Sequence, residues 1–454
     1  MTLRPVRAPP SEPDLTGPEP PLWERAAVVF VIFMLSQALI GPLFSPDQAE
    51  TPVLRLFWLP VYAVIFGLMV YRAPALVRAW PAWIIVGGLV ILVFASKYWS
   101  IDPAVTLRRT IAMAIASAFA VYLGAAFRGP HLPRVLMHAG LVMAVGSLVM
   151  IFANPTLGIH QTDNAGLWRG LWYEKNQMGM IMVASAIAAA ACLASPDPRR
   201  LLPGLTLALS VLLVLATQSK TSLLCLLVGL GAVATLWSMR RGGPAFAIVV
   251  VWIGVVVGGA AAELWFTDAA EVLRALGKDP SLTGRTEIWE SVMRRVAERP
   301  MTGYGYAAFW TLDSVPADIV QAETGWPAPS AHNGWMDLLV QLGWPGTVFV
   351  AVVVALAGLA AAIRMGGQGV REGRFSIAYL PAFLVLSLSE SVLMTHANLP
   401  WVLVLTILTR TLISEPAAAR LAAPVRRPYQ SAPRIAAHFP NGQARRSPVP
   451  VRPA

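Results

Sequence analysis

VLMHAGLVMAVGSLVMIFA, residues 135–153, is the stretch that decides the fold class of this chain. It contains no acidic residue, lysine or arginine, and a helix of about 20 apolar residues crosses a bilayer core about 30 Å thick. We therefore predict an all-α polytopic membrane protein with about twelve transmembrane helices. Eleven further apolar blocks of similar length lie at 26–44, 53–71, 80–98, 106–127, 176–195, 201–217, 220–238, 245–266, 334–363, 375–394 and 398–414.

The composition of the 454 residues excludes soluble enzyme folds. Only 13% of the residues are charged and 56% are hydrophobic, whereas soluble domains average about 25% charged residues. Cys192 and Cys225 both fall inside apolar blocks without metal-ligand spacing, so we interpret them as small core residues.

The formal net charge of +11 does not indicate a nucleic-acid partner. Seven arginines follow Glu415 and no acidic residue does, so residues 1–415 carry only +4. A basic tail beside a membrane domain is more typical of contact with anionic lipid. We predict disordered cytoplasmic termini at 1–22 and 415–454, both rich in proline, and an uncleaved first span.

Positive charges predict the orientation of the spans. With a cytoplasmic N-terminus, every short even-numbered loop carries at least two arginines, as the positive-inside rule requires. We therefore predict cytoplasmic N- and C-termini, spans one to nine within 23–266, a large periplasmic loop at 267–333, and spans ten to twelve within 334–414. The arginines are Arg72, Arg78, Arg128, Arg134, Arg199, Arg200, Arg240, Arg241, Arg364, Arg371 and Arg374.

Six cations depart from that rule and lie at the membrane edge on the opposite, external side. Cations at membrane depth are costly, so use in a functional site is one interpretation. Snorkelling of the side chains to lipid headgroups is the alternative. The six are Lys97, Arg108, Arg109, Arg169, Lys175 and Lys220.

The large loop contains three recognisable segments. TGRTEIWESVMRRVAERP, from Thr283, has apolar residues at helical spacing and predicts an amphipathic helix along the external membrane surface. MTGYGYAAFW follows, and its aromatic residues around two glycines predict a turn that stacks on a sugar ring. SAHNGWMD then brings His332 to the start of the tenth span.

Ordinary structural roles also fit these residues. Arg285 has Glu287 and Glu290 as nearby ion-pair partners. A histidine at the mouth of a span is often only an interfacial hydrogen-bonding residue, and Trp289 is of a type enriched at membrane interfaces.

The order of four segments resembles the O-antigen ligase / Wzy polymerase superfamily of bacterial envelope glycosyltransferases, and within it the ExoQ-related exopolysaccharide polymerase branch. They are KYWSIDPAVTLRR (Lys97–Arg109), YEKNQMG (Tyr173–Gly179), TGRTEIWESV with RPMTGYGYAAFW, and AHNGWMDLLVQLGWPG. One departure concerns Ser219-Lys220-Thr221, where many relatives have Ser-Arg-Gly. Lysine keeps the charge but loses the bidentate fork for phosphate.

The resemblance implies a GT-C-like, metal-independent glycosyltransferase without a cofactor in the bacterial inner membrane. Its donor would be a polyprenyl-pyrophosphate-linked oligosaccharide. Breaking the sugar–pyrophosphate bond develops negative charge on the leaving phosphate, which preorganised cations stabilise. We predict that Arg285 and His332 are catalytic, the latter orienting or deprotonating the acceptor hydroxyl. Binding of pyrophosphate or glycan is assigned to Arg108, Arg109, Arg169, Lys220, Trp289 and Tyr304.

Two alternatives stay open on the sequence. A ligase would transfer the glycan to lipid A–core, whereas a polymerase, which the ExoQ likeness favours, would transfer it to another lipid-linked repeat. A lipid-linked sugar transporter is a different class, disfavoured because no internal repeat is evident. A chain-length regulator is a further expected partner.

Overall fold

The computed structural model describes residues 19–40, 52–162, 164–195, 199–238, 285–367 and 370–413. Apart from one isolated bridge between Ile159 and Trp168, every regular element in these ranges is a helix. The predicted all-α fold is therefore confirmed for this part of the chain. The helices are α1 (Leu22–Leu35), α3 (Pro52–Tyr71), α4 (Ala73–Arg78), α5 (Trp80–Ala95), α6 (Pro103–Ala126), α7 (His131–Ala153), α8 (Pro155–Gly158), α9 (Lys175–Leu193), α10 (Leu201–Thr217), the helix Lys220–Ser238, α12 (Arg285–Glu298), α13 (Val315–Thr324), α14 (Gly334–Gly367), α15 (Val370–Ser387) and α16 (Leu399–Leu412).

Six of these helices are long and apolar enough to cross a membrane, and four more are apolar but shorter, within the residues that the structure describes. This agrees with a multi-pass membrane protein. The predicted block at 245–266, the first part of the large loop at 267–284 and most of both predicted disordered ends lie outside the described residues. The count of twelve spans stays a prediction.

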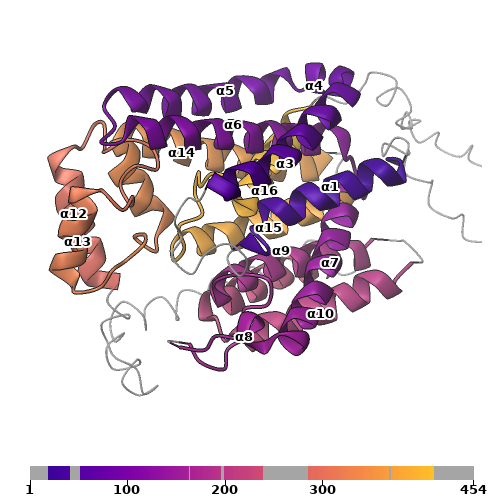
Figure 1. Ribbon diagram of the computed structural model, residues 1–454. Coiled ribbons are helices and arrows are strands. Elements are labelled where there is room, and N and C mark those ends of the chain that lie inside the picture. The colour runs from indigo at the N-terminus through magenta and orange to yellow at the C-terminus, as the bar shows by residue number, and fades with distance from the viewer. Residues whose placement is uncertain are drawn as a thin grey trace, which may run out of the picture. The chain divides into compact units, whose positions relative to one another are not determined.

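The centre of the bundle is formed by α6, α9 and α16 (Figure 1). Every residue of α16 from Leu399 to Arg410 is buried. Small residues let the helices approach closely: a Cβ on Gly140 of α7 would lie 2.5 Å from the Ser185 side chain of α9. Because lipid is as apolar as leucine, such close packing is the main source of attraction between transmembrane helices.

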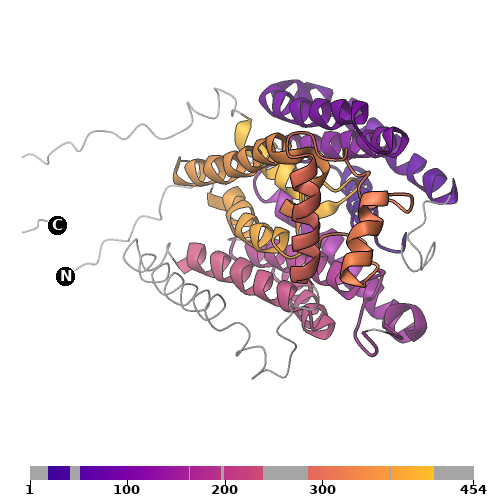
Figure 2. The ribbon, with the colours of Figure 1, turned by 90° about the vertical axis from the view of Figure 1, so that its left-hand side faces the viewer.

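Helix ends that alternate along the chain gather at two opposite ends of the bundle. At one end, which we call the site end, α12 and α13 lie beside the ends of α5 and α6, whereas α4 lies at the opposite end (Figures 1 and 2). Hydrogen bonds join the segments of the site end: Trp172 Nε1 donates to Ser36 O over 2.7 Å, and Trp99 Nε1 donates to Thr302 O over 2.8 Å. Loops predicted to share one membrane side therefore meet in space.

Helix α14 is broken at Gly343, where φ is 66° and ψ is −172°. Pro345 has no N–H, so carbonyls of the preceding turn lose their helical donors. The segment 300–305 supplies replacements. Tyr304 N donates to Val340 O over 2.9 Å, Gly305 N donates to Gln341 O over 2.9 Å, and Trp344 N donates to Pro300 O over 2.8 Å. The predicted span at 334–363 is thus two helical segments joined by a break that the loop stabilises.

The apolar face of α12 packs on protein. Ile288, Val292 and Val296 are buried in a small core with residues of α13 and α14. We predicted an amphipathic helix along the external membrane surface, and the helix is present as α12. Its apolar face is covered by α13 and α14 and not by lipid, because the sequence pattern shows only that the face is apolar and not what packs on it. The position of α12 relative to the membrane stays a prediction. Glu323 on α13 reinforces the contact by accepting hydrogen bonds from Ser291 and Arg294 of α12.

At the opposite end, α1, α6 and the turn after α3 are tied by a buried carboxylate. Glu24 has no exposed surface, accepts two hydrogen bonds from Arg72, at 2.7 and 2.5 Å, and accepts one from the Tyr122 hydroxyl at 2.6 Å. A buried carboxylate is tolerated only when it is paired and hydrogen-bonded in this way.

We expect Glu24→Ala to lower the free energy of unfolding by about 3 kcal/mol, because it leaves the Arg72 charge without its partner. Chemical denaturation of the detergent-solubilised protein measures this. Glu19→Ala is the matched control, since the Glu19 side chain is 51% exposed in its ion pair with Arg25 and such pairs contribute less than about 1 kcal/mol. Equal effects of the two substitutions would contradict the assignment.

Candidate active site

The segment 301–310 is fixed against the start of α6. Tyr306 N donates to Ser96 Oγ over 3.1 Å, and the Thr106 hydroxyl donates to Tyr306 O over 2.9 Å. Gly305 has φ of 97°, and a Cβ there would lie 2.3 Å from Ser100 Oγ, so only glycine fits. The first and third motif segments of the sequence are therefore one packed unit.

The two tyrosines of this turn point into the protein. Tyr304 is 4% exposed and Tyr306 is 2% exposed. The hydroxyl of Tyr304 donates to Glu298, and that of Tyr306 donates to Met394 O. In this conformation neither ring offers a face to a sugar, so sugar stacking by this turn stays a prediction.

His332 is held by contacts to its preceding residue, Ala331. The Ala331 carbonyl accepts a hydrogen bond from Trp289 Nε1 at 2.9 Å, and its N–H donates to Asp337 over 3.1 Å. His332 itself has φ of 48°, a conformation that costs a residue with a Cβ some strain. Trp289, which we predicted to bind substrate, thus acts in this structure on the backbone next to the histidine.

The imidazole of His332 stacks on Trp326, with ring centroids 5.4 Å apart and ring planes 12° from parallel. Its Nε2 is buried and makes no hydrogen bond to the described residues. Burial, and to a smaller extent the positive charge of Arg285, lower the pKa of His332 to about 4. The ring is therefore neutral at neutral pH, and a neutral Nε2 can accept a proton or a hydrogen bond.

Arg285 lies at the start of α12 and reaches the turn between α15 and α16. Its guanidinium donates to Ser389 O over 3.1 Å and lies 3.9 Å from Glu390 Oε1. The same Glu390 oxygen accepts a hydrogen bond from Asn176 Nδ2 at 2.9 Å. The partners that we considered on the sequence, Glu287 and Glu290, are replaced by an acid a hundred residues away.

Asn176 belongs to the Lys-Asn segment at the start of α9. Glu174 caps this helix in a reciprocal arrangement with Gln177, and Lys175 N donates to His160 Nε2 over 3.2 Å. The helix Lys220–Ser238 also begins near this turn, and its Thr221 accepts a hydrogen bond from the Ser389 hydroxyl at 3.0 Å. The segment 389–390 thus joins the second and third motif segments to the Ser-Lys-Thr sequence.

The remaining predicted substrate-binding cations differ in their surroundings. Arg169 donates to three carbonyls of its own loop, those of Thr156, Leu157 and Tyr173, at 3.2, 2.9 and 3.3 Å. Arg109 donates to Ala307 O over 2.7 Å. These two therefore stabilise loops in this structure, whereas Arg108 and Lys220 are exposed at the site end. Their roles toward substrate stay predictions.

Glu390 is the residue that sequence reasoning missed. The available signal was an acid in the sequence LSLSES, residues 386–391, inside the eleventh predicted apolar block. A carboxylate at the edge of a membrane-spanning segment is itself a reason to expect a function. Its partners were not foreseeable, because they lie 105 and 214 residues away along the chain.

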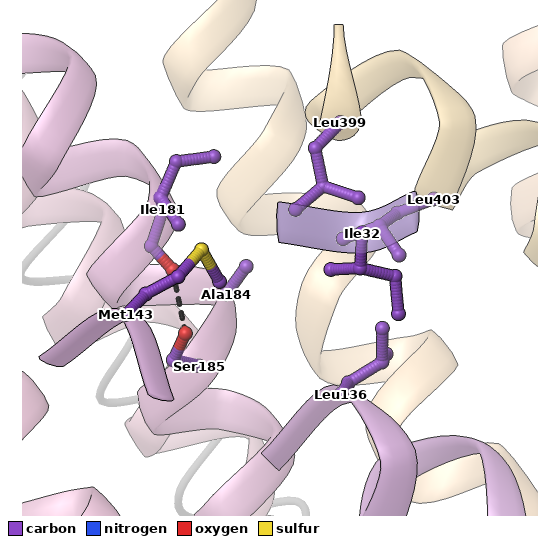
Figure 3. A pocket seen from close by; sticks show the side chains of 8 residues that line it. All are labelled: Ile32, Leu136, Met143, Ile181, Ala184, Ser185, Leu399 and Leu403. Atoms are coloured by element: carbon purple, nitrogen blue, oxygen red, sulfur yellow. Dashed lines mark hydrogen bonds between the residues drawn. The ribbon is translucent and has the colours of Figure 1, made fainter. Parts of the chain in front are cut away.

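A small apolar pocket lies elsewhere, between α1, α7, α9 and α16 (Figure 3). Ser185 is its one polar lining residue, and its hydroxyl donates to Ile181 O over 2.9 Å. The pocket offers no group suited to a diphosphate or a sugar.

We expect His332 to titrate near pH 4, and we expect Arg285→Ala to raise its pKa toward the ordinary value of about 6.5. The substitution removes a positive neighbour that disfavours the imidazolium, while burial still keeps the value low. Mass-spectrometric measurement of imidazole C2–H exchange against pH gives the pKa directly. Arg294→Ala, which alters the pair with Glu323, is the control, and titration of native His332 near pH 6.5 would contradict the burial that we describe.

Comparison with known proteins agrees with the motif arrangement. Residues 205–351 match the family model described as O-antigen ligase, a range that contains Arg285 and His332. The exopolysaccharide production protein ExoQ of Rhizobium meliloti (strain 1021) is 24% identical over 339 residues, which cover 72% of this chain and 75% of ExoQ. The chain is thus similar to the O-antigen ligase family over residues 205–351 and to ExoQ over most of its length, which supports the resemblance seen in its motifs.

Proposed function

We propose that this protein is a membrane glycosyltransferase that polymerises polyprenyl-pyrophosphate-linked oligosaccharide repeats into exopolysaccharide or O-antigen. One observation carries the proposal: Arg285, Asn176 and Glu390, from three distant segments, form one polar cluster at the site end, and the Arg285 charge acts on His332. A charged cluster at the edge of an apolar helical bundle suits a substrate with a lipid tail and an anionic head.

The protein has two roles in this reaction: it stabilises the charge on the leaving group, and it accepts a proton. The acceptor hydroxyl forms a new bond to the anomeric carbon and loses its proton, while the bond from that carbon to the diphosphate oxygen breaks. The bonding electron pair stays on the diphosphate, so negative charge develops there. Fixed cations stabilise this charge, and a base receives the proton.

We assign the stabilisation of this charge to Arg285, with Lys220 and Arg108 as further cations. Arg109 and Arg169 support the loops around them. Arg285 has a planar fork that matches phosphate oxygens. We assign the role of proton acceptor to His332, whose Nε2 makes no hydrogen bond to the described residues. Trp289 and Tyr304 act as positioning residues in this scheme.

We place the site end on the periplasmic face of the inner membrane, with both termini in the cytoplasm. The arginine pattern of the short loops supports this orientation. The meeting of the alternate loops at one end of the bundle is also what this orientation requires.

A ligase is the second candidate, and the description of the matching family model favours it. The two reactions share the donor and differ in the acceptor. The name of the similar ExoQ protein, exopolysaccharide production protein, favours the polymerase.

We expect Arg285→Ala and His332→Ala each to abolish long polymer while leaving the amount of protein in the membrane unchanged. Loss of the proton acceptor alone lowers a rate by about 10²–10⁴-fold. Gel analysis of polymer in a complemented deletion strain measures the effect. Arg294→Ala, on the same helix as Arg285, is the control and should make normal polymer; normal polymer from either site variant would remove that residue from the mechanism.

We expect a deletion strain to accumulate single repeat units on the lipid carrier, because a polymerase that is absent leaves its donor unused. Mass analysis of extracted lipid-linked glycans measures their length. Long unattached chains on the carrier would instead identify a ligase.

A further inference from the structure

Glu390 lies in the turn between α15 and α16, outside every motif segment recognised in the sequence. The residue is 9% exposed, and its Oε1 faces Asn176 from the start of α9 and Arg285 from the start of α12. Burying an ionisable side chain to this extent costs free energy unless neighbouring groups pair with it or donate hydrogen bonds to it.

Two of the elements that pack against this turn, α12 and α9, contribute the groups that act most directly on Glu390, whereas Asp337 of α14 lies near Ser391. Arg285 on α12 and Asn176 on α9 contact it, and Glu174 at the start of α9 is a further negative neighbour. Cys225, on the helix Lys220–Ser238, also lies within its electrostatic reach. Arg285 is thus the cation that most directly balances this carboxylate.

The ion pair with Arg285 is long, at 3.9 Å, while the Ser389 carbonyl holds the other terminal nitrogen at 3.1 Å. The guanidinium is therefore oriented from one side by the turn and is not consumed by a close bidentate pair. A planar fork held in this way keeps donors available for phosphate oxygens.

We infer that Glu390 is a positioning residue that orients Arg285 and Asn176 together toward the diphosphate of the lipid-linked donor. This inference rests on the proposed function. The carboxylate supplies one acceptor for both groups, so the second and third motif segments act as one unit. Binding of the dianionic head then depends on whether Glu390 carries a charge.

The direction of that dependence follows from the burial of Glu390. Desolvation raises its pKa to about 7, against the smaller opposing effect of Arg285. Below that pH the carboxyl is neutral and leaves the full charge of Arg285 to the diphosphate. Above it the carboxylate offsets Arg285 and repels the donor, so the donor KM should rise as the pH increases from 6 to 8.

The experiment measures transfer by the purified full chain, with lipid-linked repeat units from the deletion strain as donor. We expect Glu390→Ala to lower kcat/KM for the donor by about 10- to 100-fold. Glu390→Gln keeps an acceptor oxygen for Asn176 and Arg285, so it should stay within about fivefold of the native enzyme at pH 6, and its donor KM should be flat from pH 6 to 8.

The matched control is Glu323→Gln. Glu323 also forms an ion pair with an arginine of α12, but it belongs to α13 and not to the turn between α15 and α16. This variant should keep the native pH profile of the donor KM. A double-mutant cycle between Glu390→Ala and Arg285→Lys adds a second readout. If the two residues act together, the loss of kcat/KM in the double variant should be smaller than the product of the two single losses, here by about tenfold.

The outcomes separate the two proposals. If the native protein transfers no sugar between lipid carriers, the proposed function fails and the inference fails with it. If the native protein transfers sugar, but Glu390→Gln keeps the native pH dependence of the donor KM or the losses at positions 390 and 285 multiply independently, the inference alone is overturned.

Discussion

Backbone and charged groups cannot stay unpaired in the hydrocarbon part of a membrane, and this constraint organises the whole molecule. It confines the apolar blocks to helices and leaves irregular chain and ionisable groups to the two ends of the bundle. The break in α14 shows how the constraint is met where a helix is interrupted. Carbonyls freed by Gly343 and Pro345 are paired with the segment 300–305, which is thereby fixed in place.

This pairing has a consequence for the site. Tyr306, directly after this segment, is hydrogen-bonded to Ser96 and Thr106, so the broken helix, the glycine-rich turn and the start of α6 form one packed unit. His332 precedes α14, and its neighbour Ala331 is bonded to Trp289 of α12 and Asp337 of α14. The residues proposed to act in catalysis are therefore positioned by elements that also pair the freed backbone groups.

Charge is distributed differently at the two ends. At the end away from the site, Glu24 is enclosed by Arg72 and Tyr122 in short hydrogen bonds, which is a structural use of a buried carboxylate. At the site end, Glu390 is also largely enclosed by protein, with 9% of its surface exposed, but it lies 3.9 Å from its arginine. A short, saturated network stabilises the fold, whereas a long pair leaves the arginine able to bind a substrate anion.

The sequence by itself determined the helical class and most helix positions, because runs of apolar residues long enough to cross a bilayer have few other solutions. Eleven of the twelve predicted blocks fall on helices of the described chain. The order of the local motifs also predicted Arg285 and His332 as candidate catalytic residues. A motif can do this because it shows which residue types suited to the reaction lie close together along the chain.

Tertiary structure alone decided the partners of those residues. Local spacing offered Glu287 and Glu290 to Arg285, whereas folding brings it to Glu390 and Ser389. It also decided that α13, rather than lipid, covers the apolar face of α12. An amphipathic pattern specifies that a face will be buried and does not specify what buries it, and ion pairs between distant segments depend on how helices pack, which no short stretch of sequence encodes.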